Sequence, residues 1–293
     1  MASQAGAVTR EPSARFAVLG PVCVRSADGA AIPIHPPLAR RVLAILLLSA
    51  GTRRPGSWLA EAVWGDAPPQ DPGGSLRTAV CGLRRSLGES LAGRVESPDG
   101  GHSSYMLCAE PAEVDVMQFD DLAAQGRAAW YASEPRQAAD LLTAAVGLWR
   151  DPALCDVPDT PALADLRGAL IRGRADVEDL RMDARLVLGE HSEAIGELRE
   201  TLGRDPHREH VWAQLMLALA RDGRPAEALL AFAEARAALR AELGCEPGPW
   251  LMQIYHQIAG DRATPSPAGA RRGPLASASP AQPWPAPALS WPG

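Results

Sequence analysis

Three arginines in residues 73–87, GGSLRTAVCGLRRSL, are of a type and spacing that could contact a polyanion. The apolar residues of this segment recur at the spacing of a helix that buries one face: Leu76, Val80, Leu83 and Leu87. On such a helix Thr78, Cys81, Gly82 and Arg85 lie on the opposite, outward face, and Arg77 and Arg84 flank it. This pattern predicts the recognition helix of a DNA-binding helix-turn-helix. A solvated surface helix without a ligand is the alternative interpretation.

The charge of the chain divides between its two halves. The formal net charge is −6 over 293 residues, which by itself does not favour nucleic-acid binding. Residues 16–108 hold nine arginines and seven acids, whereas residues 109–260 hold fifteen arginines and twenty-six acids. This contrast predicts that the first part meets DNA and that the second part has another role. Because the first part is only weakly positive, we expect modest non-specific affinity.

The sequence offers little that could support catalysis or metal binding. Its five cysteines are scattered without a C-x-x-C pair, which predicts reduced thiols in the cytosol. His207 and His210 lack further ligands at a metal-site spacing, so we expect neither a metal nor a cofactor. The start of the chain has no secretory pattern, and no apolar run approaches the roughly 20 residues that span a bilayer. We therefore expect a cytoplasmic, nucleoid-associated protein without membrane contact, and an enzyme is the least favoured class.

The elements around the arginine-rich helix predict a winged helix. Short antiparallel strands are expected within residues 15–34, around the Asp28-Gly29 turn. Helices are expected over residues 38–50 and 58–64, and Asp71 with Pro72 can begin the third. Residues 94–107 then form a strand, a glycine turn and a strand. We expect this domain to cover residues 15–108, after a disordered segment of residues 1–14.

Beyond Val114 the pattern changes to repeated helices. Ala194, Leu198 and Thr201 have the spacing of Ala228, Phe232 and Ala235, and the two sets lie 34 residues apart, as do Gly189 and Gly223. This is the period of tetratricopeptide repeats, in which small residues let paired helices approach closely. The predicted fold is thus an α+β winged helix-turn-helix followed by an all-α tetratricopeptide-like domain over residues 109–260. Residues 261–293, rich in Pro and Ala, are expected to be a disordered tail.

Several stretches in order resemble the actinobacterial antibiotic regulatory proteins, the AfsR-like regulators. The resemblance covers residues 16–260 and rests on FAVLGPVCVR, AILLLSAG, LAEAVWGDAPP, SLRTAVCGLRRSLG, SSYML, LLTAAVGLWRDPAL, REHVWAQLMLALARDGRPAEALLAF and ELGCEPGPWL. It implies an OmpR-type winged helix joined to a bacterial transcriptional activation domain. It also implies an activator of secondary-metabolite (antibiotic) biosynthesis genes that binds promoter direct repeats as a side-by-side homodimer on double-stranded DNA and contacts RNA polymerase holoenzyme.

The resemblance also suggests which residues meet DNA. It places the helix of residues 75–87 in the major groove and the hairpin of residues 96–105 at a neighbouring minor groove. The expected DNA-binding residues are Arg77, Arg84, Arg85, Thr78, Ser75, Arg40, Arg41, His102 and Ser103.

This chain departs from the family within the third helix. The family commonly has His, Ser and Arg where this chain has Ala79, Cys81 and Gly82. The outward face has therefore lost groups that could bond to base edges. An arginine at position 82 is then expected to strengthen DNA binding. Two classes of function follow: a DNA-binding transcriptional activator, or an interaction protein of the same fold with weakened or lost sequence-specific DNA binding.

Overall fold

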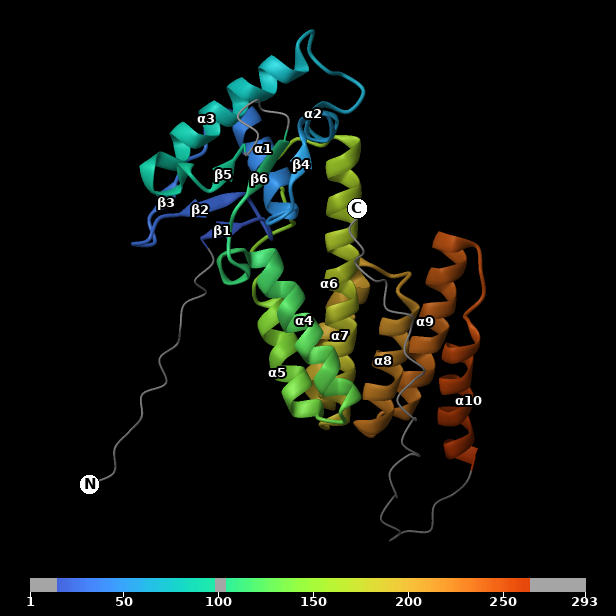
Figure 1. The fold of residues 1–293 in the computed structure, drawn as a ribbon. Helices are drawn as coiled ribbons and strands as arrows, with labels where there is room; N and C mark the ends of the chain where they lie inside the picture. The colour runs from blue at the N-terminus through green and yellow to red at the C-terminus, as the bar shows by residue number, and fades with distance from the viewer. Residues whose placement is uncertain (1–14, 98–103, 264–293) are drawn as a thin grey trace, which may run out of the picture. The chain divides into compact units, whose positions relative to one another are not determined.

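The computed structural model describes residues 15–97 and 104–263, and its first part is a winged helix (Figure 1). Three strands form an antiparallel sheet in the order β1 (Phe16–Ala17), β2 (Cys23–Arg25) and β3 (Ala31–Ile32). The helices are α1 (Pro37–Leu48), α2 (Gly56–Trp64) and α3 (Pro72–Ala92). A second sheet has the order β4–β6–β5 and is built from β4 (Arg54–Pro55), β5 (Val95–Glu96) and β6 (Ser104–Leu107).

Local sequence explains where these elements begin. Proline opens both α1 and α3, where its missing N–H costs no helical hydrogen bond. The Asp71 side chain accepts a hydrogen bond from the Gly74 amide at 2.8 Å, so it caps α3 as the sequence predicts. α1 is apolar on nearly every side because it is the central helix of this part, with Val42, Leu43, Ile45 and Leu46 fully buried. The sequence did not predict β4, whose two residues lack an alternating pattern and pair only through β6.

The second part of the chain is helical. A 3-10 turn, η1 (Pro111–Glu113), precedes α4 (Asp115–Tyr131), α5 (Pro135–Val146) and α6 (Pro161–Val187). They are followed by α7 (His191–Arg204), α8 (Glu209–Arg221), α9 (Pro225–Leu243) and α10 (Pro249–Ala263). Within its hairpins the small residues expected from the repeat pattern are buried, including Ala138, Ala145, Ala194, Ala228 and Ala235. The tetratricopeptide-like fold is therefore confirmed.

The helical hairpins share one form of turn. Gly189 (φ 87°), between α6 and α7, and Gly223 (φ 82°), between α8 and α9, are both left-handed. After each, the next amide donates to the carbonyl five residues back, as in a Schellman motif: Glu190 to Arg185 at 3.1 Å and Arg224 to Leu219 at 2.9 Å. The 34-residue spacing of the two glycines thus reflects a repeated helix end.

The turn between α4 and α5 has the same hydrogen bonds without a glycine. The Glu134 amide donates to the Ala129 carbonyl at 2.9 Å, and Ser133 takes the left-handed position with φ 61°. A residue with a Cβ is strained in this conformation.

Ser133→Gly is therefore expected to raise the free energy of unfolding by about 0.5–1 kcal/mol, as measured by urea denaturation. The reciprocal variant Gly223→Ser is expected to lose a similar amount, since a Cβ there would meet nothing within 4 Å and only the backbone conformation would change. A loss of stability on Ser133→Gly would contradict the expectation.

The chain divides into two compact units, and the division falls between Arg181 and Met182, within α6. The domain boundary predicted at residues 108 and 109 lies inside the first unit and stays a prediction. This unit contains the winged helix together with α4, α5 and most of α6. The second unit has its own core, formed around Trp212, Met216 and Phe232.

Within the first unit, carboxylates of the helical part bind the backbone of residues 18–22. Asp115, at the start of α4, accepts hydrogen bonds from the Val18 and Leu19 amides at 2.8–2.9 Å. Asp156 accepts from the Val22 amide at 2.8 Å. These bonds join the winged helix to the helices after residue 108, which explains why the compact unit extends beyond the predicted boundary.

Arg150 strengthens the same junction. Its guanidinium lies 3.6 Å from an Asp115 carboxylate oxygen and donates to the Pro21 carbonyl at 3.1 Å. Burial raises the pKa of Asp115, while the two amides and Arg150 act in the opposite direction. Near these groups Leu154 is fully buried in a left-handed conformation (φ 56°), and its amide donates to the Val18 and Gly20 carbonyls.

Asp120, on α4, gives the stability of the first unit a pH dependence. Burial raises its pKa from 3.8 to about 6, although Arg127 acts in the opposite direction. Because the folded pKa exceeds the unfolded value, the stabilisation of the protonated carboxyl is present below pH 3.8 and is lost as the pH rises to about 6. This corresponds to at most about 3 kcal/mol, and partial contact with water reduces it to about 1–2 kcal/mol.

Asp120→Asn is accordingly expected to be more stable than the parent protein above pH 6 and equally stable near pH 4. Thermal unfolding followed by circular dichroism across this range measures the difference. Asp121→Asn, at the exposed neighbouring position, is the matched control. Parallel pH profiles for the parent protein and Asp120→Asn would contradict the prediction.

Among the described residues, no helix is long and apolar enough to cross a membrane.

Candidate nucleic-acid interface

The helix α3 presents a polar face to solvent and buries an apolar one. Leu76, Leu83 and Leu87 are at most 2% exposed, as the spacing predicts. Arg77, Thr78, Cys81 and Arg85 are exposed. This is the arrangement of a helix that is held by a leucine stripe and can offer side chains to the major groove.

Two hydroxyl residues of this helix differ in their positions. The Thr78 hydroxyl donates to the Gly74 carbonyl at 3.0 Å, so it is bound within the helix while the side chain lies on the exposed face. Ser75, in the first turn, is half-buried. The two arginines of the exposed face are therefore the longest side chains that α3 offers to a ligand.

Arg84 lies on a flank of α3 and binds the strand β5. Its Nε and Nη2 donate to the Val95 carbonyl at 3.0 and 2.7 Å, and Nη2 also donates to Ser97 Oγ at 3.0 Å. The sequence places Arg84 beside the outward face as a DNA contact. The structure instead places its guanidinium against the β5–β6 hairpin, because the hairpin packs beside α3.

Arg40 and Arg41 are also engaged within the protein. Arg40 Nη1 lies 3.0 Å from the Asp156 carboxylate, and its Nη2 donates to the Ile34 carbonyl. Arg41 Nη1 donates to the Val63 carbonyl, near the end of α2, at 3.0 Å. Both are half-buried and hold contacts within the protein, so their expected role as DNA contacts stays a prediction. The cause of these contacts is tertiary: α2 and the segment before α6 pack against α1.

The other two expected contacts, His102 and Ser103, lie outside the described residues.

The departures from the family at positions 79 and 82 do not lie on the outward face. Ala79 is 2% exposed and belongs to the core. A Cβ built on Gly82 would lie 3.3 Å from Cδ of Pro36, so this glycine faces the segment before α1. Of the three departures, only Cys81 is exposed. The expectation that an arginine at position 82 would reach DNA from this face is therefore corrected.

Gly82→Arg is instead expected to destabilise the winged helix by up to about 2 kcal/mol, because the Cβ that presses on Pro36 costs about 1–3 kcal/mol. This cost opposes the gain of roughly 1 kcal/mol in helix propensity. Thermal unfolding of the variant measures the balance. Cys81→Arg, at the exposed neighbouring position, is the control and is expected to leave the melting temperature almost unchanged.

Sequence reasoning did not identify a small hollow beside Arg77. It is lined by the first turns of α2 and α3 and by β6, through Gly56, Ser57, Ala60, Pro72, Gly73, Leu76, Arg77 and Tyr105. Burial raises the pKa of Tyr105, and the charges of Arg77 and Arg84 act in the opposite direction. Arg77 and Tyr105 thus line the same hollow.

Arg53 and Arg54, just before α2, were also absent from the predicted contacts. Arg53 is exposed, whereas the guanidinium of Arg54 lies 4.5 Å from the centre of the Trp58 ring. Two adjacent arginines shortly before a predicted helix are a pattern in the sequence that could have indicated them as candidate DNA contacts.

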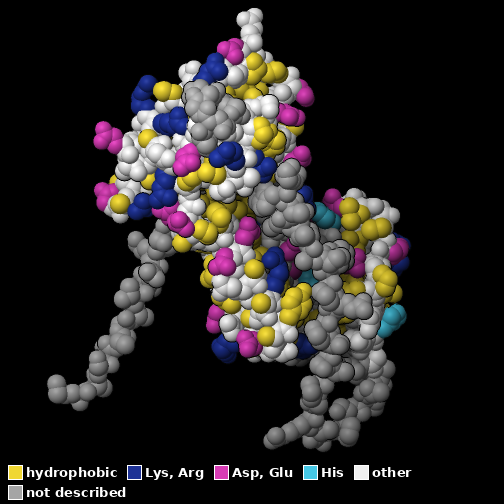
Figure 2. Space-filling model, in the orientation of Figure 1, with side chains coloured by type: hydrophobic (Ala, Val, Ile, Leu, Met, Phe, Trp, Pro, Cys, Tyr) yellow, Lys and Arg dark blue, Asp and Glu magenta, His cyan; other side chains and the backbone are white. Residues whose placement is uncertain are grey.

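The charged surface is mixed. In the view of Figure 2, arginine side chains lie among acidic ones over the described part of the winged helix. This agrees with the weak positive charge of residues 16–108.

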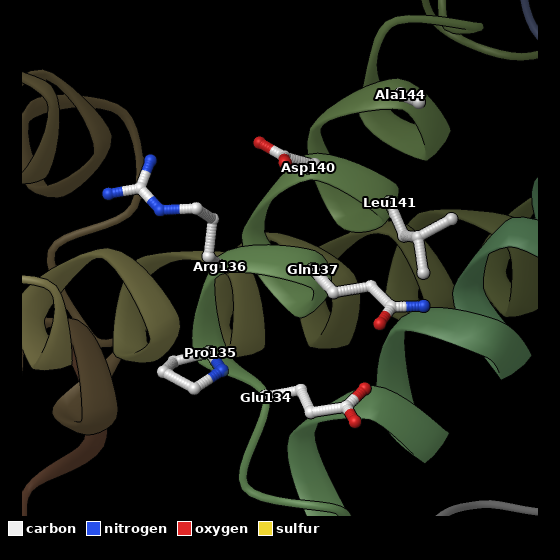
Figure 3. Close-up of a pocket in the computed structure, with 7 residues that line it drawn as sticks. All are labelled: Glu134, Pro135, Arg136, Gln137, Asp140, Leu141 and Ala144. Carbon is white, nitrogen blue, oxygen red and sulfur yellow. The ribbon is translucent and has the colours of Figure 1, made fainter.

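A hollow of different character lies on α5. Figure 3 shows Arg136 and Asp140 pointing to one side of this helix and Leu141 to the other. Its lining, which also includes Glu134, Pro135, Gln137 and Ala144, combines opposite charges with apolar atoms and has no nucleophile beside a base. Within the described part of the chain, no group of three or more His, Cys, Asp or Glu residues could hold a metal ion.

Comparison with known proteins agrees with this fold. The Bacterial transcriptional activator domain family matches residues 114–259. Regulatory protein AfsR of Streptomyces griseus is 36% identical over 83% of this chain and 24% of its own length. Regulatory protein DnrI of Streptomyces peucetius is 33% identical over 82% of this chain and 90% of its own length. The solved structure of Mycobacterium tuberculosis EmbR in complex with a low affinity phosphopeptide has a TM-score of 0.78 at 28% identity, covering 88% of this chain and 67% of that one.

A winged helix followed by tetratricopeptide-like helices, with regulatory proteins as relatives, defines the class of this protein as a transcription regulator. The chain belongs to the AfsR-like family of actinobacterial antibiotic regulatory proteins. It spans about a quarter of the length of AfsR and most of the length of DnrI.

Proposed function

We propose that this chain binds double-stranded promoter DNA through the exposed face of α3 and activates genes of secondary-metabolite (antibiotic) biosynthesis. The observation that carries the proposal is the pair Arg77 and Arg85, both exposed on a helix whose leucines are buried. Guanidinium groups can bond to guanine edges and to phosphates. Thr78 is exposed on the same face and adds a shorter contact.

The partners follow from the family. Two copies side by side on promoter direct repeats would align two α3 helices on one face of the duplex, and the helical-repeat domain would contact RNA polymerase holoenzyme. Residues 109–260 carry an excess of acids, so this part does not itself favour DNA.

Titration of the protein against a labelled duplex that holds direct repeats from the promoter beside its own gene tests the proposal. We expect a sequence-dependent affinity that falls steeply with salt, because bound phosphates release counterions. A scrambled duplex of equal length is the control. Equal binding to both duplexes, or binding that does not respond to salt, would overturn the proposal.

A second function is favoured by the number of arginines already engaged. Arg40, Arg41 and Arg84 all bind groups of the protein itself. A chain left with two exposed arginines on α3 could serve as an interaction protein with weakened or lost sequence-specific DNA binding. If the protein has this second function, the same titration is expected to show equal affinity for the repeat duplex and the scrambled duplex. The helical-repeat domain is still expected to bind RNA polymerase.

A further inference from the structure

We propose that Arg84 is a positioning residue that fixes the β5–β6 hairpin against α3, so that the helix and the hairpin approach DNA as one rigid reader. This inference rests on the proposed DNA-binding function for its consequence, and on the contacts of Arg84 for its geometry. Three hydrogen bonds run from Arg84 to the base of the hairpin, two to the Val95 carbonyl and one to Ser97 Oγ.

The hairpin needs such an anchor. β5 consists of two residues and, within the described part of the chain, pairs with β6 alone, through Val95 opposite Leu107 and Glu96 opposite Met106. β5 is therefore an edge strand of the β4–β6–β5 sheet, held by strand pairing on one side only. Apolar packing around the buried Val95 also holds β5, but this packing depends little on direction. Hydrogen bonds depend strongly on angle, so the fork of Arg84 can set the tilt of β5.

A second polar contact holds α3 from its other flank. Ser86 Oγ donates to the His35 carbonyl at 2.7 Å, and the His35 amide donates to Ser86 Oγ at 3.2 Å. Residues 84 and 86 are about 200° apart around a helix, so the two contacts oppose each other. Arg85 lies between them on the exposed face. The pair therefore fixes the rotation of α3 about its axis and thus the direction in which Arg85 points.

This role differs from a phosphate contact in a measurable way. Loss of a phosphate contact flattens the dependence of log affinity on log salt by about one unit. Loss of a positioning residue weakens binding at every salt concentration and leaves the slope unchanged, because the number of bound phosphates is the same. It also loosens the hairpin when no DNA is present.

The test compares Arg84→Ala and Arg84→Lys with Arg85→Ala in the full chain. Without DNA, hydrogen exchange followed by mass spectrometry is expected to be faster in residues 94–107 for both Arg84 variants and unchanged for Arg85→Ala. Peptides from α1 should exchange as in the parent protein. Against the repeat duplex, the Arg84 variants are expected to bind roughly tenfold more weakly with the parent slope, whereas Arg85→Ala flattens it.

Hairpin exchange unchanged in the Arg84 variants, together with a flattened salt slope, would overturn the inference and make Arg84 a phosphate ligand. If Arg84→Ala does not fold, Ser97→Ala removes a single hydrogen bond, and unchanged exchange in both Ser97→Ala and Arg84→Lys would equally overturn it. If the parent protein binds no DNA, the proposed function fails, while the exchange measurement still decides whether Arg84 fixes the hairpin.

Discussion

Asp115→Ala is expected to lower the free energy of unfolding of the first compact unit by about 3–5 kcal/mol. The variant leaves the amides of Val18 and Leu19 without their acceptor and removes the carboxylate that faces Arg150. Each buried donor that loses its partner costs about 1–3 kcal/mol, and the loss of the ion pair with Arg150 adds to this. Differential scanning calorimetry of the full chain measures the change.

The second compact unit provides an internal reference for this experiment. Asp115 lies in the first unit, so the transition of the unit that begins at Met182 should keep its midpoint. Asp140→Ala, which removes an exposed carboxylate from α5, is the matched control and is expected to cost less than 0.5 kcal/mol, roughly the limit for surface substitutions. A change below about 1 kcal/mol in Asp115→Ala would show that the winged helix and α4 are only loosely joined.

The double variant Arg77→Ala/Arg85→Ala is expected to weaken binding to a repeat duplex by about 2–5 kcal/mol. Each arginine that meets a base contributes about 1–3 kcal/mol, and each that meets a phosphate contributes to the salt slope. The two side chains are a turn or more apart on α3, so their effects should be nearly additive. Fluorescence anisotropy at several salt concentrations gives both the affinity and the slope.

The matched control for the DNA measurement is Arg25→Ala, which removes an exposed arginine from β2. We expect it to bind as the parent protein does. If the double variant also binds as tightly as the parent, α3 is not the DNA-binding face, and the interaction-protein function gains support.

Much of the architecture could be predicted from residue patterns alone. Asp71 and Pro72 mark the start of α3, and the leucine spacing that follows them selects its buried face. Gly189 and Gly223 mark two equivalent helix ends, since left-handed backbone favours glycine. These features depend on neighbours within a few residues or on a period that repeats along the chain. Both kinds of pattern can be recognised from the sequence alone.

Only some residues of the candidate DNA interface could be predicted from the sequence. Arg77, Thr78 and Arg85 lie on the exposed face, as the helical spacing requires. Arg84 was expected at the edge of the same face, but β5 returns beside α3 and accepts its hydrogen bonds. Position 82 was expected outside, but the segment before α1 approaches it. Helical geometry predicts the direction in which a side chain points, but it does not predict which other segments of the chain pack against that side chain.

The sequence by itself determined the order of the elements, the buried face of α3 and the repeat of the helical hairpins. Tertiary structure alone decided which arginines stay exposed and where the compact units divide. Arg40 meets Asp156 across 116 residues of chain, and Val18 meets Asp115 across 97. Such pairs form because burial of apolar surface brings distant segments together, and polar groups trapped there must then find partners. Local propensity carries no record of those partners, so an arginine that binds a carboxylate and one that is exposed look alike in the sequence.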